Sequence, residues 1–214
     1  HMRIRSVFSH LAASDEQEHD TFTLPQLEEF KNMSEQVIKA CHYPVYRHVS
    51  NSAAITRFPQ AEFDMVRLGI GLYGIGADEK EQQGLQNVST LKTTISQIKT
   101  VLSGESIGYS RKAVIKQSTV IATVPIGYAD GLSRKLGNGR GMMIVNGKKA
   151  PIIGNVCMDM CMLDITGIEA HEGDEVLIFG ELQPITAVAK AMESIPYEVL
   201  TNVSRRVKRV YYQE

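Results

Sequence analysis

The segment PVYRHVSNSAAITRF, residues 44–58, changes within a few positions from a strand-like pattern to a helix-like one. The apolar run IRSVFSHL lies before it at residues 4–11, and the apolar run DMVRLGIGLYGIG follows at residues 64–76. Between the first two of these segments, Leu27 and Phe30 open an apolar pattern of roughly helical spacing that continues to Cys41, with Pro25 in a position suited to a first helical turn. The alternation predicts about three parallel βα units.

The pattern changes from about Ser89 onward. β-branched runs are then separated by turn signals, and Asn146-Gly147 between two apolar runs is typical of a tight hairpin. We therefore expect an antiparallel barrel or sandwich, with short helices near ITAVAKAME and YEVLTNVS and a last strand at VKRVYY. The polar segment DEKEQQGLQN, residues 78–87, is the predicted linker.

The composition excludes few functions, but it limits the classes of binding partner that the chain is expected to have. The 23 basic residues nearly balance the 24 acidic ones, which favours neither nucleic acid nor an anionic membrane surface. No apolar stretch approaches the roughly 20 residues that span a bilayer. The three cysteines are few, odd in number and remote from any histidine cluster, so we expect reduced thiols in the cytoplasm and no metal site.

Several polar residues lie where the predicted strands end. Ser52 begins a predicted helix, where a hydroxyl and free N–H groups suit a phosphate, although a serine there is ordinarily a helix cap. Arg67 lies on an apolar run, where a charge needs a partner, so a salt-bridged or snorkelling arginine is the alternative. His10 and Tyr109, taken singly, fit structural roles equally well.

A further group of polar and apolar residues lies between the strands of the second half. IGYADG contains Tyr128 and Asp130, and CMDM contains Met158 and Asp159. A turn at Ala129-Asp130-Gly131 and a core methionine are the ordinary interpretations of these segments.

The order of six segments is more specific than any one of them. SVFSHLAASDE, HVSNSAAI, MVRLGIGLYG, SIGYS, IGYADG and CMDM follow one another as in alanine racemases, and the chain resembles that family over nearly its whole length. The resemblance implies the last part of a TIM-type (β/α) barrel over residues 3–84 and the C-terminal β-domain over residues 85–214. It also implies a cytoplasmic, bacterial homodimer that interconverts L- and D-alanine for peptidoglycan synthesis with pyridoxal 5'-phosphate.

The same resemblance implies roles for single residues. Ser52 and the backbone at Gly69 and Ile70 would bind the cofactor phosphate, and Arg67 would face the pyridine nitrogen. Tyr109, donated across the dimer, would be the base for the L-enantiomer, with His10 between it and Arg67. The remaining implied residues are Tyr128, Met158 and Asp159 on the substrate side, and Asp15 and Arg134 at the entrance.

One part of the family pattern is missing. No lysine lies in a segment like the one that holds the cofactor covalently, so we expect this chain alone to be inactive. Asn155 stands where some relatives carry an arginine of the entrance, and Arg205 where some carry a phosphate-binding tyrosine. The natural protein is then expected to be longer, by the first part of the barrel alone or by a fused enzyme as well.

Two other functions stay open. A barrel-type pyridoxal-phosphate decarboxylase shares the domain plan but carries glutamate at the pyridine nitrogen, which Arg67 disfavours. A non-catalytic binding or dimerisation module would keep the same motifs without using them.

Overall fold

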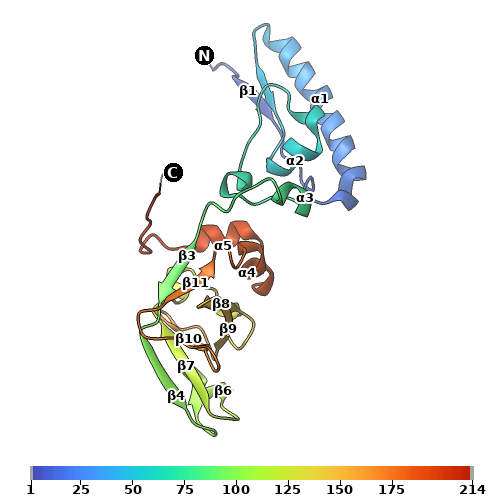
Figure 1. The fold of residues 1–214 in the computed structure, drawn as a ribbon. Helices are drawn as coiled ribbons and strands as arrows, with labels where there is room; N and C mark the ends of the chain where they lie inside the picture. Colours follow the sequence, from blue (N-terminus) through green and yellow to red (C-terminus); the bar gives the residue numbers. More distant parts are fainter. Residues whose placement is uncertain (1, 213–214) are drawn as a thin grey trace. The chain divides into compact units, whose positions relative to one another are not determined.

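A computed structural model describes residues 2–212 of the chain. The chain divides into two compact units, His1–Val88 and Ser89–Glu214, and each unit is described by itself (Figure 1). Among the described residues, no helix combines the length and the apolar composition needed to cross a membrane.

The first unit combines a small parallel sheet with helices. Strands β1 (Ser6–Phe8) and β2 (Tyr46–His48) pair in parallel, with Ser6 opposite Tyr46 and Phe8 opposite His48. A parallel pair needs a long crossover connection, and the 22-residue helix α1 (Asp20–Cys41) supplies it. The other elements are η1 (Gln17–His19), α2 (Ser52–Arg57), η2 (Pro59–Ala61), η3 (Ile70–Tyr73) and α3 (Glu79–Gln82).

Helix α1 covers the sheet with one apolar face. Its Leu27 and Phe30 are buried against residues that follow β1 and β2, among them Leu11 and Val49. The helix begins five residues before Pro25, so the prediction of Pro25 in the first turn was wrong. The periodic apolar positions were identified correctly because the helix buries only one side.

The predicted third strand does not form. Residues 65–69 have no regular secondary structure, and the following residues make the 3-10 helix η3, which ends at Gly74 with a φ of 72°. Glycine tolerates this left-handed backbone, which an extended strand does not contain. The N–H groups of Asp64 and Arg67 still donate to the carbonyls of Arg47 (3.2 Å) and Ser50 (2.9 Å), but no strand forms, and the unit has two strands where about three were expected.

The second unit contains one curled antiparallel sheet. Its seven strands lie in the order β3-β11-β8-β9-β10-β7-β4. β3 and β4 lie at opposite ends of this order, yet only Ile95 and Ser96 separate them in the chain. The sheet must therefore curl until its two edges meet. The strand bounds are β3 (Leu91–Thr94), β4 (Gln97–Val101), β7 (Thr119–Val124), β8 (Met142–Val145), β9 (Lys148–Ile153), β10 (Cys161–Asp164) and β11 (Glu175–Phe179).

Shorter elements complete this unit. A small hairpin of β5 (Ser106–Ile107) and β6 (Ala113–Val114) encloses the 3-10 turn η4 (Tyr109–Arg111). Helices α4 (Ile185–Ala191) and α5 (Pro196–Asn202) pack together near the end of the chain. The 3-10 turns η5 (Tyr128–Asp130) and η6 (Arg134–Leu136) lie in the long connection from β7 to β8.

The expected combination of an incomplete parallel α/β barrel with an antiparallel β-domain is confirmed. The hairpin at Asn146-Gly147 forms as predicted, with φ angles of 47° and 76° at the two turn positions. The last strand expected at residues 207–212 is absent, and Tyr211 and Tyr212 are largely exposed. Strand-forming residue types do not pair without a neighbouring edge.

Candidate active site

Arg67 is the centre of a hydrogen-bond network at the ends of β1 and β2. Its guanidinium donates to the carbonyl oxygens of Ser9 (2.9 Å), His48 (3.2 Å) and Val49 (3.2 Å). It also donates to the Nδ1 atoms of His48 (2.9 Å) and His10 (3.1 Å). None of these five acceptors is a carboxylate, and no ion pair to Arg67 occurs within residues 2–212. The positive charge is therefore held in place without being neutralised.

His48 is a part of this network that the sequence interpretation missed. Its ring stacks on Phe8 from the neighbouring strand, with centroids 5.2 Å apart and planes 3° apart, and its side chain is buried. Burial, and then the charge of Arg67, lower the pKa of His48. A neutral ring can accept from Arg67 at Nδ1. No sequence signal singled out His48, because its contact with Phe8 depends on the register in which β1 and β2 pair.

Ser52 and the glycine-rich segment meet at the start of α2. The Ser52 hydroxyl oxygen accepts hydrogen bonds from the backbone N–H groups of Gly69 (2.8 Å) and Gly71 (3.3 Å). A Cβ atom at Gly71 would lie 3.1 Å from Leu68 and 3.7 Å from the Ser52 oxygen, so a side chain would crowd this point. Ile70 is buried as the first residue of η3.

The helix cap at this point belongs to another residue. Asn51 accepts from the N–H of Ala54 (3.0 Å), so Ser52 is not the N-cap of α2. The Ser52 hydroxyl oxygen is the common acceptor of the two backbone N–H groups, and its own O–H can donate, as a phosphate ligand requires.

The second unit presents Tyr109 on the loop between β5 and β6. Its side chain is 74% exposed within this unit. The carbonyl oxygen of Tyr109 accepts a hydrogen bond from the side-chain amide of Asn155 (3.2 Å). The tyrosine is therefore attached through its backbone while its hydroxyl end is open.

Tyr128 and Met158 lie side by side in the second unit. The N–H of Tyr128 donates to the carbonyl of Cys157 (3.0 Å), and the N–H of Ala129 donates to that of Met158 (3.0 Å). Gly127 makes this approach possible, because a Cβ atom there would lie 2.3 Å from the Met158 carbonyl oxygen. The structure thus brings together two of the three residues predicted on the substrate side.

Arg206 connects Asp159 to the same group. It donates to Asp130 (2.7 Å) and to Asp159 (2.6 Å), and these hydrogen bonds, that to Asp130 first, raise the pKa of Arg206. The sequence contained no signal for this bridge, because Arg206 is 76 positions from Asp130. The predicted residues therefore fall into two sets, one in each unit, with Asp15 on the loop before η1 and Arg134 in η6.

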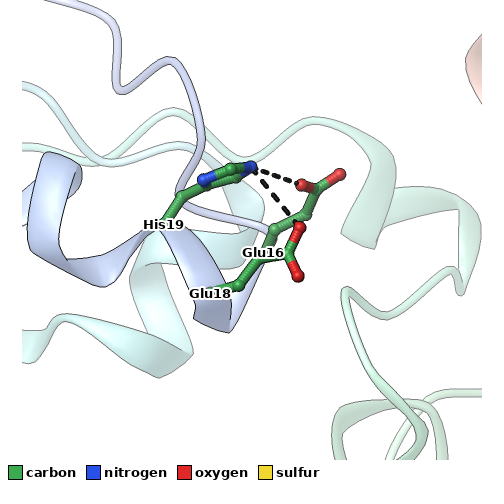
Figure 2. Close-up of side chains that lie close together, drawn as sticks. All are labelled: Glu16, Glu18 and His19. Atoms are coloured by element: carbon green, nitrogen blue, oxygen red, sulfur yellow. Dashed lines mark ion pairs between the residues drawn. The ribbon is translucent and has the colours of Figure 1, made fainter.

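One group of potential metal ligands exists in the described part of the chain. The Nε2 atom of His19 lies 3.0 Å from a carboxylate oxygen of Glu16 and 3.7 Å from one of Glu18 (Figure 2). All three side chains are exposed, and all come from η1 and the residue before it. Ion pairing within the group accounts for this geometry.

Comparison with known proteins identifies the relatives of both units. The family described as "Alanine racemase, N-terminal domain" matches residues 1–77, and that described as "Alanine racemase, C-terminal domain" matches residues 88–211. "Alanine racemase 2" of Caldanaerobacter subterraneus is 43% identical over 98% of this chain and 55% of its own length. "Alanine racemase 1" of Clostridium acetobutylicum is 40% identical over 97% of this chain and 55% of its own length.

Solved structures give the same result. Alanine racemase from Streptomyces lavendulae superposes with a TM-score of 0.91 at 34% identity, covering 99% of this chain and 57% of that one. Alanine racemase from Bartonella henselae, which carries covalently bound pyridoxal phosphate, gives a TM-score of 0.87 at 32% identity, covering 98% of this chain and 57% of that one. The chain spans just over half the length of these relatives.

Proposed function

The chain belongs to the alanine racemase family, and on that premise we propose that it is part of an enzyme that interconverts L- and D-alanine with pyridoxal phosphate. Residues 3–84 would be the end of the cofactor-binding barrel, and residues 85–214 the C-terminal β-domain. The observation that carries the proposal is the guanidinium of Arg67, bound to carbonyl and imidazole acceptors and to no carboxylate.

Pyridoxal phosphate fits the residues of the first unit. The Ser52 hydroxyl and the backbone at Gly69 and Ile70 would hold its phosphate, and the bonds from the N–H groups of Gly69 and Gly71 to Ser52 support this role by bringing Ser52 beside that backbone. The chemistry that the bound cofactor supplies is acidification of the hydrogen on the amino acid's α-carbon.

Arg67 would lie opposite the pyridine nitrogen. A guanidinium stays charged at any pH a protein experiences, so it can donate a hydrogen bond but cannot accept one. That nitrogen then stays unprotonated, which limits electron withdrawal and side reactions such as transamination. His10 and His48 would hold the guanidinium by accepting from two of its nitrogens.

Racemisation needs a proton-moving group on each face of the α-carbon. Tyr109, from the second subunit of a homodimer, would remove or return the proton on the L-face, and its exposed side chain in the isolated unit supports a role across an interface. Tyr128, Met158 and Asp159 would line the side of the substrate carboxylate. Asp15 and Arg134 would line the entrance.

The base on the other face would be a lysine from outside these 214 residues. No lysine of the chain lies in a matching segment, while the chain spans about 55% of its first relatives. This supports a longer enzyme of which the chain is a part, inactive when isolated, and we propose that this enzyme is a cytoplasmic dimer. It also keeps a non-catalytic binding or dimerisation role as the second candidate for the isolated chain.

The test compares the full-length protein with its Tyr109→Phe variant. Incorporation of deuterium at the α-carbon is followed by mass spectrometry from pure L-alanine and pure D-alanine. We expect the rate of deuterium incorporation from L-alanine to fall about a hundredfold to ten-thousandfold in the variant. Incorporation from D-alanine should be kept, because only one base is removed. Tyr211→Phe, in the exposed C-terminal segment, is the matched control.

Three results would contradict the proposal. Equal losses for both enantiomers would make Tyr109 a binding residue rather than a base. No loss would remove its role altogether. Release of carbon dioxide from amino acids in place of racemisation would identify a decarboxylase. The 214-residue chain with pyridoxal phosphate should give no D-alanine above the level of the free cofactor.

A further inference from the structure

We propose that Asn155 is a positioning residue for Tyr109, and that it acts through a hydrogen-bond chain that begins at Asn138. This inference rests on the proposed function, because it assigns a purpose to the place of Tyr109. It concerns contacts within the second unit only.

The loop that carries Tyr109 has an unfavourable backbone. Gly108, Ser110 and Arg111 have φ angles of 74°, 61° and 50°. Glycine adopts such angles freely, but two consecutive residues with side chains do so only where surrounding contacts hold them. The Tyr109 side chain is 74% exposed and cannot supply those contacts within this unit. Arg111 Nε donates to Ser106 Oγ (3.0 Å) inside the hairpin, so a bond that ties the loop to the rest of the unit must come from another segment.

Asn155 supplies such a bond. Its Nδ2 donates to the carbonyl oxygen of Tyr109 (3.2 Å), and its Oδ1 accepts from Nδ2 of Asn138 (3.0 Å). The amide nitrogen of Asn155 donates and its amide oxygen accepts, so a flipped amide would lose both hydrogen bonds and the orientation is fixed. Asn138 is itself fixed, because its backbone N–H donates to the carbonyl of Gly154 (2.7 Å).

Close packing brings the two segments together. A Cβ atom at Gly154 would lie 3.1 Å from the carbonyl oxygen of Ile107, and one at Gly108 would lie 3.6 Å from the backbone nitrogen of Asn155. The residues on both sides thus touch through backbone atoms. The side-chain amide of Asn155 links this contact to Tyr109, and it fixes the position of the Tyr109 backbone.

Three variants of the full-length protein test this role. Asn155→Asp keeps the shape of the side chain but places an acceptor opposite the Tyr109 carbonyl, Asn155→Ala removes the group, and Asn138→Gly removes the first donor while tolerating the φ of 58° at that position. The control is Asn202→Ala, which removes a side-chain amide that donates to Glu198 of the same helix (3.5 Å).

The first measurement is deuterium incorporation from each alanine enantiomer. We expect Asn155→Asp and Asn155→Ala to lose about ten- to a hundredfold with L-alanine, since misplacement of a reacting group by about 1 Å has effects of that size. Deuterium incorporation from D-alanine should not change in these variants. In Asn202→Ala, incorporation should be unchanged with both enantiomers. Asn138→Gly should show the same asymmetry with a smaller loss.

The second measurement is amide hydrogen exchange over residues 106–114 without cofactor or substrate. The Asn155 variants should exchange faster in this hairpin and not in the seven-stranded sheet. Equal losses for both enantiomers, or no loss, would overturn the proposal if Tyr109→Phe shows its asymmetry. If Tyr109→Phe shows none, the proposed function fails, and unchanged amide exchange at residues 108–111 then overturns the positioning role independently.

Discussion

The two units differ in how complete their sheets are. In the first unit, the pair β1 and β2 leaves Phe8 66% and Tyr46 54% exposed. In the second unit, the seven-stranded sheet curls so that its edge strands β3 and β4 follow each other in the chain, and Leu163 and Val176 on its strands have no exposed surface. An open parallel edge binds further strands, while a curled sheet does not need them. The second unit is therefore the self-sufficient one.

The two units also differ in the partners of their central arginines. Arg67 is bound to neutral acceptors, whereas Arg206 is bound to the carboxylates of Asp130 and Asp159. The charge of Arg206 is neutralised where it lies, and its effect is to join two loops. The charge of Arg67 stays available to a ligand. Two arginines of one chain thus serve different purposes because their partners differ.

The largest expected effect concerns local stability. In the isolated chain, backbone amides of β1 and β2 should exchange with solvent about a hundredfold or more faster than those of β7 and β10. Amide exchange followed by mass spectrometry measures this difference. In the full-length protein the exchange of β1 and β2 should slow, because upstream strands would cover their edge. Uniformly slow exchange across residues 3–84 of the isolated chain would show that the first unit needs no such cover.

An intermediate effect is expected from Arg67→Met. The apolar stem is kept, but the carbonyls of Ser9, His48 and Val49 lose a donor, which should destabilise the first unit by about 2–3 kcal/mol. Arg209→Met is the matched control, because Arg209 also donates to three backbone carbonyls but on the exposed surface.

Urea unfolding of both variants measures the difference. We expect the control to change stability by less than about 0.5 kcal/mol, since water can replace its hydrogen bonds. Equal effects for the two arginines would mean that the network at Arg67 adds nothing to stability.

The sequence predicted the elements whose signals are local. Helix α1 follows from apolar spacing, and the hairpin at Asn146-Gly147 follows from residues that accept positive φ. Residues 65–76 were predicted wrongly because apolar content does not distinguish a buried strand from an irregular segment, and Met65, Leu68 and Leu72 are in fact 46%, 49% and 60% exposed. Gly74, with its left-handed φ, ends the 3-10 helix that stands where the later part of this strand was expected.

The site could be predicted only through the order of segments that resembles a known family, because its residues lie far apart in the chain: 57 positions separate His10 from Arg67. His10 and Arg67 were both selected, and the structure places them 3.1 Å apart. His48 and Arg206 were missed because their roles depend on partners across a strand pair or 76 positions away. Spacing along the chain contains no information on such contacts.

The smallest expected effect is a pH dependence confined to the first unit. Burial, and then Arg67, lower the pKa of His48 below its ordinary value of 6.5 in the folded state. The unfolded chain then binds the proton more readily, so the stability that neutral His48 contributes is present above about pH 6.5 and is lost as the pH falls below it.

The loss can be at most about 1.4 kcal/mol per pH unit for one proton. Amide exchange of β2, corrected for the intrinsic effect of pH, should show it between pH 7.5 and about 5.5. His48→Gln should remove most of this pH dependence of β2 exchange, since the glutamine amide oxygen can still accept from Arg67 but does not titrate. In the second unit, the histidine within residues 89–212 is the exposed His171, so β7 and β10 serve as an internal reference. If β2 of the His48→Gln variant lost stability as steeply as that of the original protein, another group would be responsible, and the burial of His48 would have no thermodynamic consequence.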